Sequence, residues 1–356
     1  MEKKRNLYID MVKGTAIFLM LWGHCIQYCV AGTELDFFEN FLFKTIYSFH
    51  MPLFMLVSGY LFFYSFSKRS MKELLIHRTQ SLLHPIVFGS LFIFLVTTAL
   101  ADALTGKAVA IFDGAWLCKL SSLWFLWSVL VASLATTLAC KTQKKLPVQV
   151  LLFLVMIPLI ALFPNASLNI YMYPYFILGF YFAKFKDKLP QWVHRAKYAS
   201  LLLFPLMLCF YEKKHYIYIT GLLPDQVYSL MDMLLIDAYR WLIGLVGSVF
   251  ALTLLDICCQ HVLLKVKRPI ISAGLAALGE KSLQIYVLSV PFLSMYLSAG
   301  FPKILSVLKI HNIFATNIVV YNFVFTFLLA VSYALALYCL TKLLEKLNLS
   351  RIIFGK

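Results

Sequence analysis

The stretch YIDMVKGTAIFLMLWGHCIQY, residues 8–28, decides the fold class. It is mostly apolar, and one helix of about 20 such residues crosses the hydrocarbon core of a bilayer. Basic residues precede it, as in a signal peptide, but the run is long and lacks a small-residue cleavage site. We therefore interpret it as a retained first span. Its ionisable residues Asp10, Lys13 and His24 are costly in lipid, which makes them functional candidates.

The composition extends this interpretation to the whole chain. Of 356 residues, 62% are hydrophobic and only 13% are charged, whereas soluble domains carry about 25% charged residues. The net charge of +16 comes from short basic clusters between apolar runs, a pattern typical of membrane loops. Membrane lipid is the expected environment, and nucleic acid is not an expected partner. The eight cysteines form no CxxC pair, so we expect neither a metal site nor a disulfide framework.

Apolar runs of spanning length recur along the sequence. The sequence predicts an all-α, polytopic membrane helix bundle of about ten transmembrane helices, with residues 1–356 forming a single integral-membrane domain. The fifth and seventh runs are short, so each could be tilted, re-entrant or merged with a neighbour. The predicted runs are 9–30, 46–66, 83–103, 119–140, 148–164, 168–184, 198–212, 234–256, 279–299 and 317–341.

Basic clusters predict the orientation. Alternate loops together carry 22 of the 32 Lys and Arg residues, which assigns them to the cytoplasm by the positive-inside rule. Both termini are then cytoplasmic, and we expect a multi-pass protein of the inner (plasma) membrane. The basic loops are Lys3 to Arg5, Lys68 to Arg78, Lys141 to Lys145, Lys184 to Lys197, Lys265 to Arg268 and Lys342 to Lys356.

Two ionisable residues of the first helix share a face. Eleven residues separate Lys13 from His24, close to three helical turns, so their side chains lie on one line about 16 Å apart along the axis. This spacing suits a long anionic donor whose phosphates bind Lys13 while its far end reaches His24. Imidazole is suited to general-base catalysis near neutral pH. Alternatively, Lys13 extends to the headgroups and His24 is a packing residue.

The first helix resembles that of acyltransferase family 3, in which a basic residue, ten further residues and a histidine form the opening motif. Here these are Lys13 and His24, with Asp10 and Gly14 also in place. The resemblance continues along most of the chain. The further similar segments are FHMPLFMLVSGY (49–60), HRTQSLLHPI (77–86), SLWFLW (122–127), YPYFILGF (173–180) and LGEKSLQIYVLSVPF (278–292).

The resemblance implies an O-acyl, usually O-acetyl, transfer from cytoplasmic acetyl-CoA or another acyl-CoA to a glycan or lipid-linked oligosaccharide, without a metal. By position, His24 is the catalytic histidine and Lys13 the basic residue of the motif, and Asp10 is a catalytic candidate with them. Arg78 would bind the CoA phosphates from a cytoplasmic loop, and Trp124 would line the donor or acceptor channel. The FHMPLF and WFLW forms are most similar to the branch of fucose 4-O-acetylase-like proteins.

The sequence also departs from the family pattern. Many members have a histidine where this chain has Ser289, which puts a second histidine role in doubt. His84 precedes Pro85 and leaves the basic segment thinner than usual.

Four further residues are candidates for substrate binding. His50 and Trp127 could contact the acceptor, and His50 could face His24 across a shared cavity; an interfacial histidine and a belt tryptophan are the plainer alternatives. Asp237 and Arg240, three residues apart, could form a local ion pair that binds the acceptor or supports His24.

Two other function classes remain open. A transporter or flippase of a lipid-linked glycan would use the same buried polar residues to line a pathway, although we find no paired repeats or matching broken spans. A glycan polymerase or ligase is expected to carry an outer loop with several Arg residues, and the longest outer loop has none before Arg240. The sequence leaves the acceptor sugar, the acyl length and the oligomeric state open.

Overall fold

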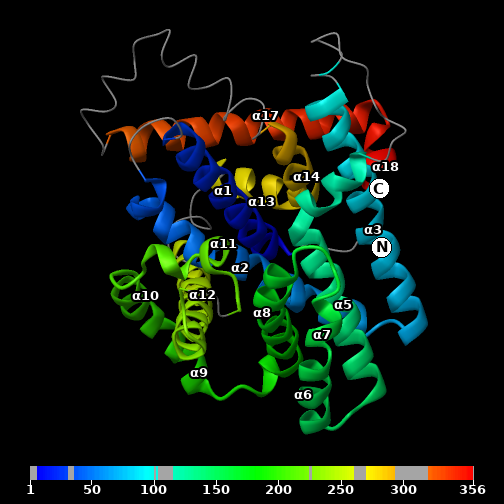
Figure 1. Ribbon diagram of the computed structural model, residues 1–356, viewed down its shortest axis with the longest axis vertical. Coiled ribbons are helices and arrows are strands. Elements are labelled where there is room, and N and C mark those ends of the chain that lie inside the picture. Colours follow the sequence, from blue (N-terminus) through cyan, green and yellow to red (C-terminus); the bar gives the residue numbers. More distant parts are fainter. Residues whose placement is uncertain are drawn as a thin grey trace. The chain divides into compact units, whose positions relative to one another are not determined.

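The computed structural model describes residues 6–30, 36–99, 102, 115–223, 227–259, 270–292 and 320–355. Every regular element in those ranges is helical, so the all-α prediction is confirmed. The helices, many of them labelled in Figure 1, are α1 (Leu7–Val30), α2 (Phe41–Phe66), α3 (Met71–Phe94), α5 (Trp124–Thr142), α6 (Leu146–Val155), α7 (Ile157–Ile160), α8 (Ala166–Phe185), α9 (Gln191–Ala196), α10 (Ser200–Leu208), α11 (Ile217–Thr220), α12 (Leu230–Cys258), α13 (Ile270–Glu280), α14 (Ser282–Phe292), α17 (Thr326–Lys346) and α18 (Leu349–Phe354).

Six helical segments in the described ranges are long and apolar enough to cross a membrane. The predicted count of about ten and the predicted orientation of the termini are not confirmed. Three shorter apolar helical stretches also occur, at Leu146–Ile160, Ile270–Glu280 and Ser282–Pro291. The six spanning segments are Leu7–Tyr28, Phe41–Phe66, Met71–Thr98, Trp116–Thr142, Leu230–Cys258 and Phe323–Lys346.

The predicted runs that differ most from the observed helices contain helix breaks. The run 148–164 is divided into α6 and α7 at Met156, and Pro158 then occupies the first turn of α7, where its missing N–H costs nothing. In the run 198–212 the α-helix is α10, with nine residues, and the short 3-10 helix Lys197–Ala199 precedes it. The run 279–299 begins in α13, which ends at Glu280, and continues in α14; its residues 293–299 lie outside the described ranges.

Helix α3 begins earlier than the hydropathy indicates. The Ser70 hydroxyl accepts from the Glu73 amide, and the Glu73 carboxylate accepts from the Ser70 amide at 3.0 Å. This reciprocal capping box starts the helix at Met71. Arg78 therefore lies on α3 and not in a loop, which corrects the predicted setting of that residue.

The chain divides into two compact units, and the first comprises Met1–Tyr47, Gly89–Lys119 and Leu255–Lys356. Within it, α1 packs against α13 and α17, and α14 packs against α17 (Figure 1). The Trp22 indole donates to the Thr326 hydroxyl at 3.0 Å. The helix with the sequence motif is thus enclosed by helices from the C-terminal part of the chain.

Glycines let α1 and α13 touch backbone to backbone. A Cβ at Gly14 would overlap the carbonyl oxygen of Leu275, and a Cβ at Gly279 would overlap that of Asp10. Small residues at such a crossing allow the close approach that stabilises helix pairs in membranes. The crossing fixes the turn of α1 that carries Asp10 and Lys13.

The second unit comprises Ser48–Phe88 and Leu120–Leu254. Here α5 packs on α8 and α6 packs on α5. A Cβ at Gly59 of α2 would overlap the Phe176 carbonyl of α8, and a Cβ at Gly179 would overlap the Leu56 carbonyl. The unit therefore repeats the reciprocal glycine crossing of the first.

Candidate functional site

His24 lies in the penultimate turn of α1 and is half-buried. Its Nδ1 is 3.3 Å from Oε1 of Gln27 and 3.1 Å from the hydroxyl of Tyr47 on α2. The Tyr28 ring stacks on the imidazole with centroids 6.1 Å apart. The imidazole is therefore held on one edge by two polar groups and on one face by an aromatic ring.

The other ring nitrogen has no such restraint. No described residue forms a hydrogen bond with His24 Nε2. A neutral imidazole has one protonated and one lone-pair nitrogen, so a ring held only through Nδ1 can use Nε2 to accept a proton. This is the arrangement that a general base needs.

Asp10 in the first turn of α1 and Lys13 in the second form an ion pair. Lys13 Nζ lies 2.8 Å from Asp10 Oδ1, and the two side chains are 20% and 13% exposed. Because α1 is continuous from Leu7 to Val30, Lys13 and His24 are on one helix with the predicted separation. The roles predicted for Asp10 and Lys13 stay predictions.

Arg78 lies on α3 with its guanidinium 4.7 Å from the centroid of the Phe62 ring. Its Nε is buried, and none of the described residues bonds to it. Lys141 donates to the carbonyls of Phe66 and Arg69 at 2.9 and 2.8 Å and so fixes the turn that leads into α3. The predicted role of Arg78 in binding the CoA phosphates stays a prediction.

The two candidate tryptophans are both on α5. Trp124 is half-buried, and its indole meets the Tyr218 ring edge to face, with centroids 6.4 Å apart. The Trp127 indole N–H is already used, since it donates to the Leu120 carbonyl at 2.9 Å. The predicted roles of both tryptophans in ligand binding stay predictions.

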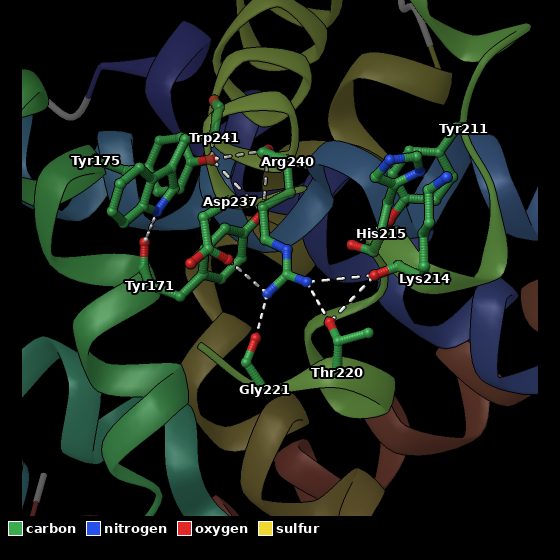
Figure 2. A network of polar contacts seen from close by, with 10 residues as sticks. All are labelled: Tyr171, Tyr175, Tyr211, Lys214, His215, Thr220, Gly221, Asp237, Arg240 and Trp241. Atoms are coloured by element: carbon green, nitrogen blue, oxygen red, sulfur yellow. Dashed lines mark hydrogen bonds and ion pairs between the residues drawn. The ribbon is translucent and has the colours of Figure 1, made fainter. Parts of the chain in front are cut away.

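The predicted local ion pair on α12 is confirmed, because Arg240 Nη1 lies 3.0 Å from Asp237 Oδ1. Arg240 is only 1% exposed, and its guanidinium also donates to the Gly221 carbonyl, the Thr220 hydroxyl and the Lys214 carbonyl (Figure 2). One buried cation therefore binds three groups of the segment 213–221.

Tyrosines of α8 complete this network. The Tyr175 hydroxyl lies 3.0 Å from the Trp241 carbonyl and 3.3 Å from the Arg240 carbonyl (Figure 2). The Trp241 indole donates to the Tyr171 carbonyl at 3.1 Å. The contacts bind α8, α12 and the segment 213–221 together, while the predicted role of Asp237 and Arg240 in acceptor binding stays a prediction.

His50 and Ser289 are both buried. His50 belongs to the second unit and His24 to the first, so their proposed meeting stays a prediction. The Ser289 hydroxyl donates to the Tyr286 carbonyl at 2.8 Å, and the Ser289 carbonyl accepts from Tyr333 at 2.9 Å. Among the residues that the structure describes, no three His, Cys, Asp or Glu side chains lie close enough together to hold a metal ion.

Sequence reasoning missed Gln27 and Tyr47. The contact of Gln27 with His24 could have been predicted, because residues three apart on a helix share a face. Tyr47 follows His24 by 23 positions and reaches it only through the packing of α2, so no local pattern indicates it. The carbonyls that hold Arg240 carry no sequence signal either.

Comparison with known proteins identifies the family. The model of acyltransferase family 3, described as an acyltransferase domain, matches residues 6–337. The chain is 31% identical over 204 residues to nodulation protein NolL of Sinorhizobium fredii, covering 56% of this chain and 54% of that protein. It is 30% identical over 187 residues to nodulation protein NolL of Mesorhizobium japonicum, covering 51% and 48% respectively.

The chain thus spans about half the length of the curated relatives it matches. No solved structure matches it. The family model nevertheless covers most of the sequence, including the Lys13 and His24 motif. The chain therefore belongs to acyltransferase family 3.

Proposed function

We propose that this protein is a multi-pass inner-membrane O-acyltransferase. It moves an acyl group, acetyl in the first instance, from cytoplasmic acyl-CoA to a hydroxyl of a cell-surface polysaccharide or its lipid-linked precursor. The observation that carries the proposal is His24 itself, an imidazole inside an apolar helix that is held through Nδ1 alone. Membership of an acyltransferase family supports the reaction class.

The reaction follows from this imidazole. His24 Nε2 takes the proton of the acceptor hydroxyl while the oxygen attacks the thioester carbonyl carbon. The new C–O bond forms, the C–S bond breaks, and the imidazolium returns its proton to the CoA thiolate. Such proton transfer contributes about 10²- to 10⁴-fold in rate. An acyl-histidine intermediate would use the same nitrogen as nucleophile.

The donor enters from the basic side in this proposal. Lys13 and Arg78 bind its phosphates, and the pantetheine arm covers the roughly 16 Å along α1 to His24. A phosphate that binds Lys13 competes with the Asp10 carboxylate, which lies 2.8 Å away. Asp10 then holds Lys13 in place until the donor arrives. The proposal includes about ten spans with both termini cytoplasmic.

The acceptor side is assigned to aromatic and polar residues. Trp124 and Trp127 offer ring faces for a sugar, since aromatic rings present broad apolar faces. His50 and Asp237 complete the proposed acceptor set, and Arg240 contributes to it by holding the Asp237 carboxylate in place through their ion pair. The likeness of the FHMPLF and WFLW segments to fucose 4-O-acetylase-like proteins favours a deoxysugar acceptor.

Acetyl-CoA binding and CoA release by the purified protein test this function. Wild type is expected to bind acetyl-CoA and release CoA, His24→Ala to bind it without releasing CoA, and Lys13→Ala to lose binding. The His24→Ala protein must elute as a folded species in size-exclusion chromatography. If no version binds acetyl-CoA, the acyltransferase proposal fails and glycan transport becomes the hypothesis to test.

A further inference from the structure

We infer that Tyr47 and Gln27 are positioning residues that keep the proton of neutral His24 on Nδ1, so that the lone pair is on Nε2. The inference rests on the proposed function and adds two residues to it. Neither residue belongs to the sequence motif, and neither is assigned to the acceptor or the donor.

The hydrogen-bond chemistry fixes the direction of the proton. Gln27 Oε1 lies 3.3 Å from His24 Nδ1, and an amide oxygen can only accept, so Nδ1 must be the donor. The Tyr47 hydroxyl donates to the same Oε1 at 3.4 Å, and its oxygen, 3.1 Å from Nδ1, can accept from the imidazole. All three contacts are satisfied only when Nδ1 carries the proton.

Packing holds Tyr47 in this arrangement. Gly23 precedes His24, and a Cβ at this position would clash with the Tyr47 ring. The absence of a side chain at Gly23 therefore lets the Tyr47 ring pack against α1. The Phe43 ring stacks on the Tyr47 ring, with centroids 3.9 Å apart. Asn40 Oδ1 accepts from the Phe43 amide at 3.1 Å and so fixes the start of α2. The hydroxyl is therefore presented to His24 by a rigid turn.

The expected kinetic consequence is specific. Without these partners the neutral imidazole populates both tautomers and rotates more freely, so fewer molecules present the lone pair to the acceptor. Loss of a partner that orients a metal-bound histidine typically costs about 10- to 100-fold, and we expect a loss of that order here. The loss should fall on kcat, because neither residue is placed in the donor site.

Four variants test the inference in the detergent-purified full chain, with acetyl-CoA as donor, water as the acyl acceptor and CoA release by thioester hydrolysis as the readout. Tyr47→Phe and Gln27→Met are expected to lower kcat at least 10-fold with KM for acetyl-CoA within 2-fold of wild type. Gln27→Glu retains an acceptor for Nδ1–H and is expected to recover kcat to within a few-fold of wild type. Tyr28→Phe is the control, since its ring stacks on His24 but its hydroxyl bonds to no described residue.

Rates are normalised to folded protein by size-exclusion chromatography and thermal unfolding. The inference is overturned if Tyr47→Phe and Gln27→Met keep wild-type kcat while His24→Ala is inactive, or if Gln27→Glu is as slow as Gln27→Met. An equal loss in Tyr28→Phe would also overturn it, because the effect would then be general to aromatic packing. The proposed function itself fails only if wild type releases no CoA or His24→Ala remains active.

Discussion

His24 and Arg240 are both polar side chains within apolar helices, but their surroundings differ. His24 is half-buried and is held at Nδ1, while no described residue bonds to its Nε2. Arg240 is 1% exposed, and its two terminal nitrogens bind a carboxylate, a hydroxyl and two backbone carbonyls. The histidine keeps one reactive atom available, whereas the arginine spends its terminal donors within the protein.

The difference separates two uses of a costly polar group. A buried cation needs partners for its charge, and a network of such contacts orders the backbone around it. In Arg240 the two terminal nitrogens have such partners, and Nε has none among the described residues. A catalytic group must instead retain one unsatisfied position for the substrate. We therefore expect changes at Arg240 to act mainly on stability and changes at His24 mainly on rate.

The largest expected effect on stability is at Arg240. Arg240→Met would leave the Asp237 carboxylate and the Gly221 carbonyl without their partner, and breaking a buried pair in this way costs about 3–5 kcal/mol. Thermal unfolding of the purified protein should show a strongly lowered midpoint or no folded protein. Lys214→Ala is the control, because only the backbone carbonyl of Lys214 contacts Arg240. Equal stability of both variants would remove the contrast with His24.

The next largest effect on stability is expected at the crossing of α1 and α13. Gly14→Ala would drive a methyl group into the Leu275 carbonyl and separate α1 from α13, at a cost of about 1–3 kcal/mol. Gly274→Ala on α13 meets no atom within 4 Å and should be neutral or slightly stabilising. Thermal unfolding in one detergent compares the pair. A stable Gly14→Ala protein would show that the crossing does not fix α1.

A smaller effect is expected at Lys13. Lys13→Gln removes the proposed phosphate contact and should weaken acetyl-CoA binding about 10-fold, the value of one charge-assisted hydrogen bond. Lys44→Gln is a matched control, since Lys44 is also paired with a carboxylate and is 19% exposed against 20% for Lys13. Equilibrium binding of labelled acetyl-CoA measures both. Equal loss in the two variants would indicate a general charge effect.

A pH dependence of stability is expected near Arg240. Burial, reinforced by the charge of Lys214, lowers the pKa of His215 to about 4, and its Nδ1 accepts from the Glu212 amide at 2.9 Å. The unfolded chain binds a proton at His215 below about pH 6.5, while the folded chain does not until about pH 4. Stability should therefore fall across that window as the pH is lowered.

His215→Gln should flatten this slope, because it removes the titrating group. The difference between the unfolding midpoints of wild type and variant at pH 7 and pH 5 is the measurement. Parallel slopes in the two proteins would contradict a depressed pKa for His215.

Much of the fold and part of the site follow from local sequence patterns. The first helix was predicted at 9–30 and is observed at Leu7–Val30, because a long apolar run bounded by polar residues defines both ends. The ion pair of Asp237 and Arg240 follows from residues three apart on a helix. Gly59 allows α8 to pack closely against α2. A glycine inside an apolar run does not by itself identify the helix that packs against it.

The rest depends on contacts that the linear sequence does not contain. Hydropathy placed Arg78 in a loop because the first turns of α3 are polar, yet a capping box makes them helical. Pro158 was a visible signal that the run 148–164 is interrupted. The approach of Tyr47 to His24 and the carbonyls around Arg240 are products of packing, which no spacing rule encodes.

The central claim is that His24 serves the reaction and Arg240 serves stability. Its most direct test compares purified His24→Gln with purified Arg240→Met, with both measurements made on the same preparation of each variant. The measurement is CoA release per folded molecule by hydrolysis of acetyl-CoA without a glycan acceptor, together with the unfolding midpoint. We predict that His24→Gln unfolds at nearly the same midpoint as wild type but releases CoA at least 100-fold more slowly. Arg240→Met is expected to unfold at a lower midpoint, while its folded fraction keeps most of the wild-type rate of CoA release. A His24→Gln protein that releases CoA at the wild-type rate would contradict the account.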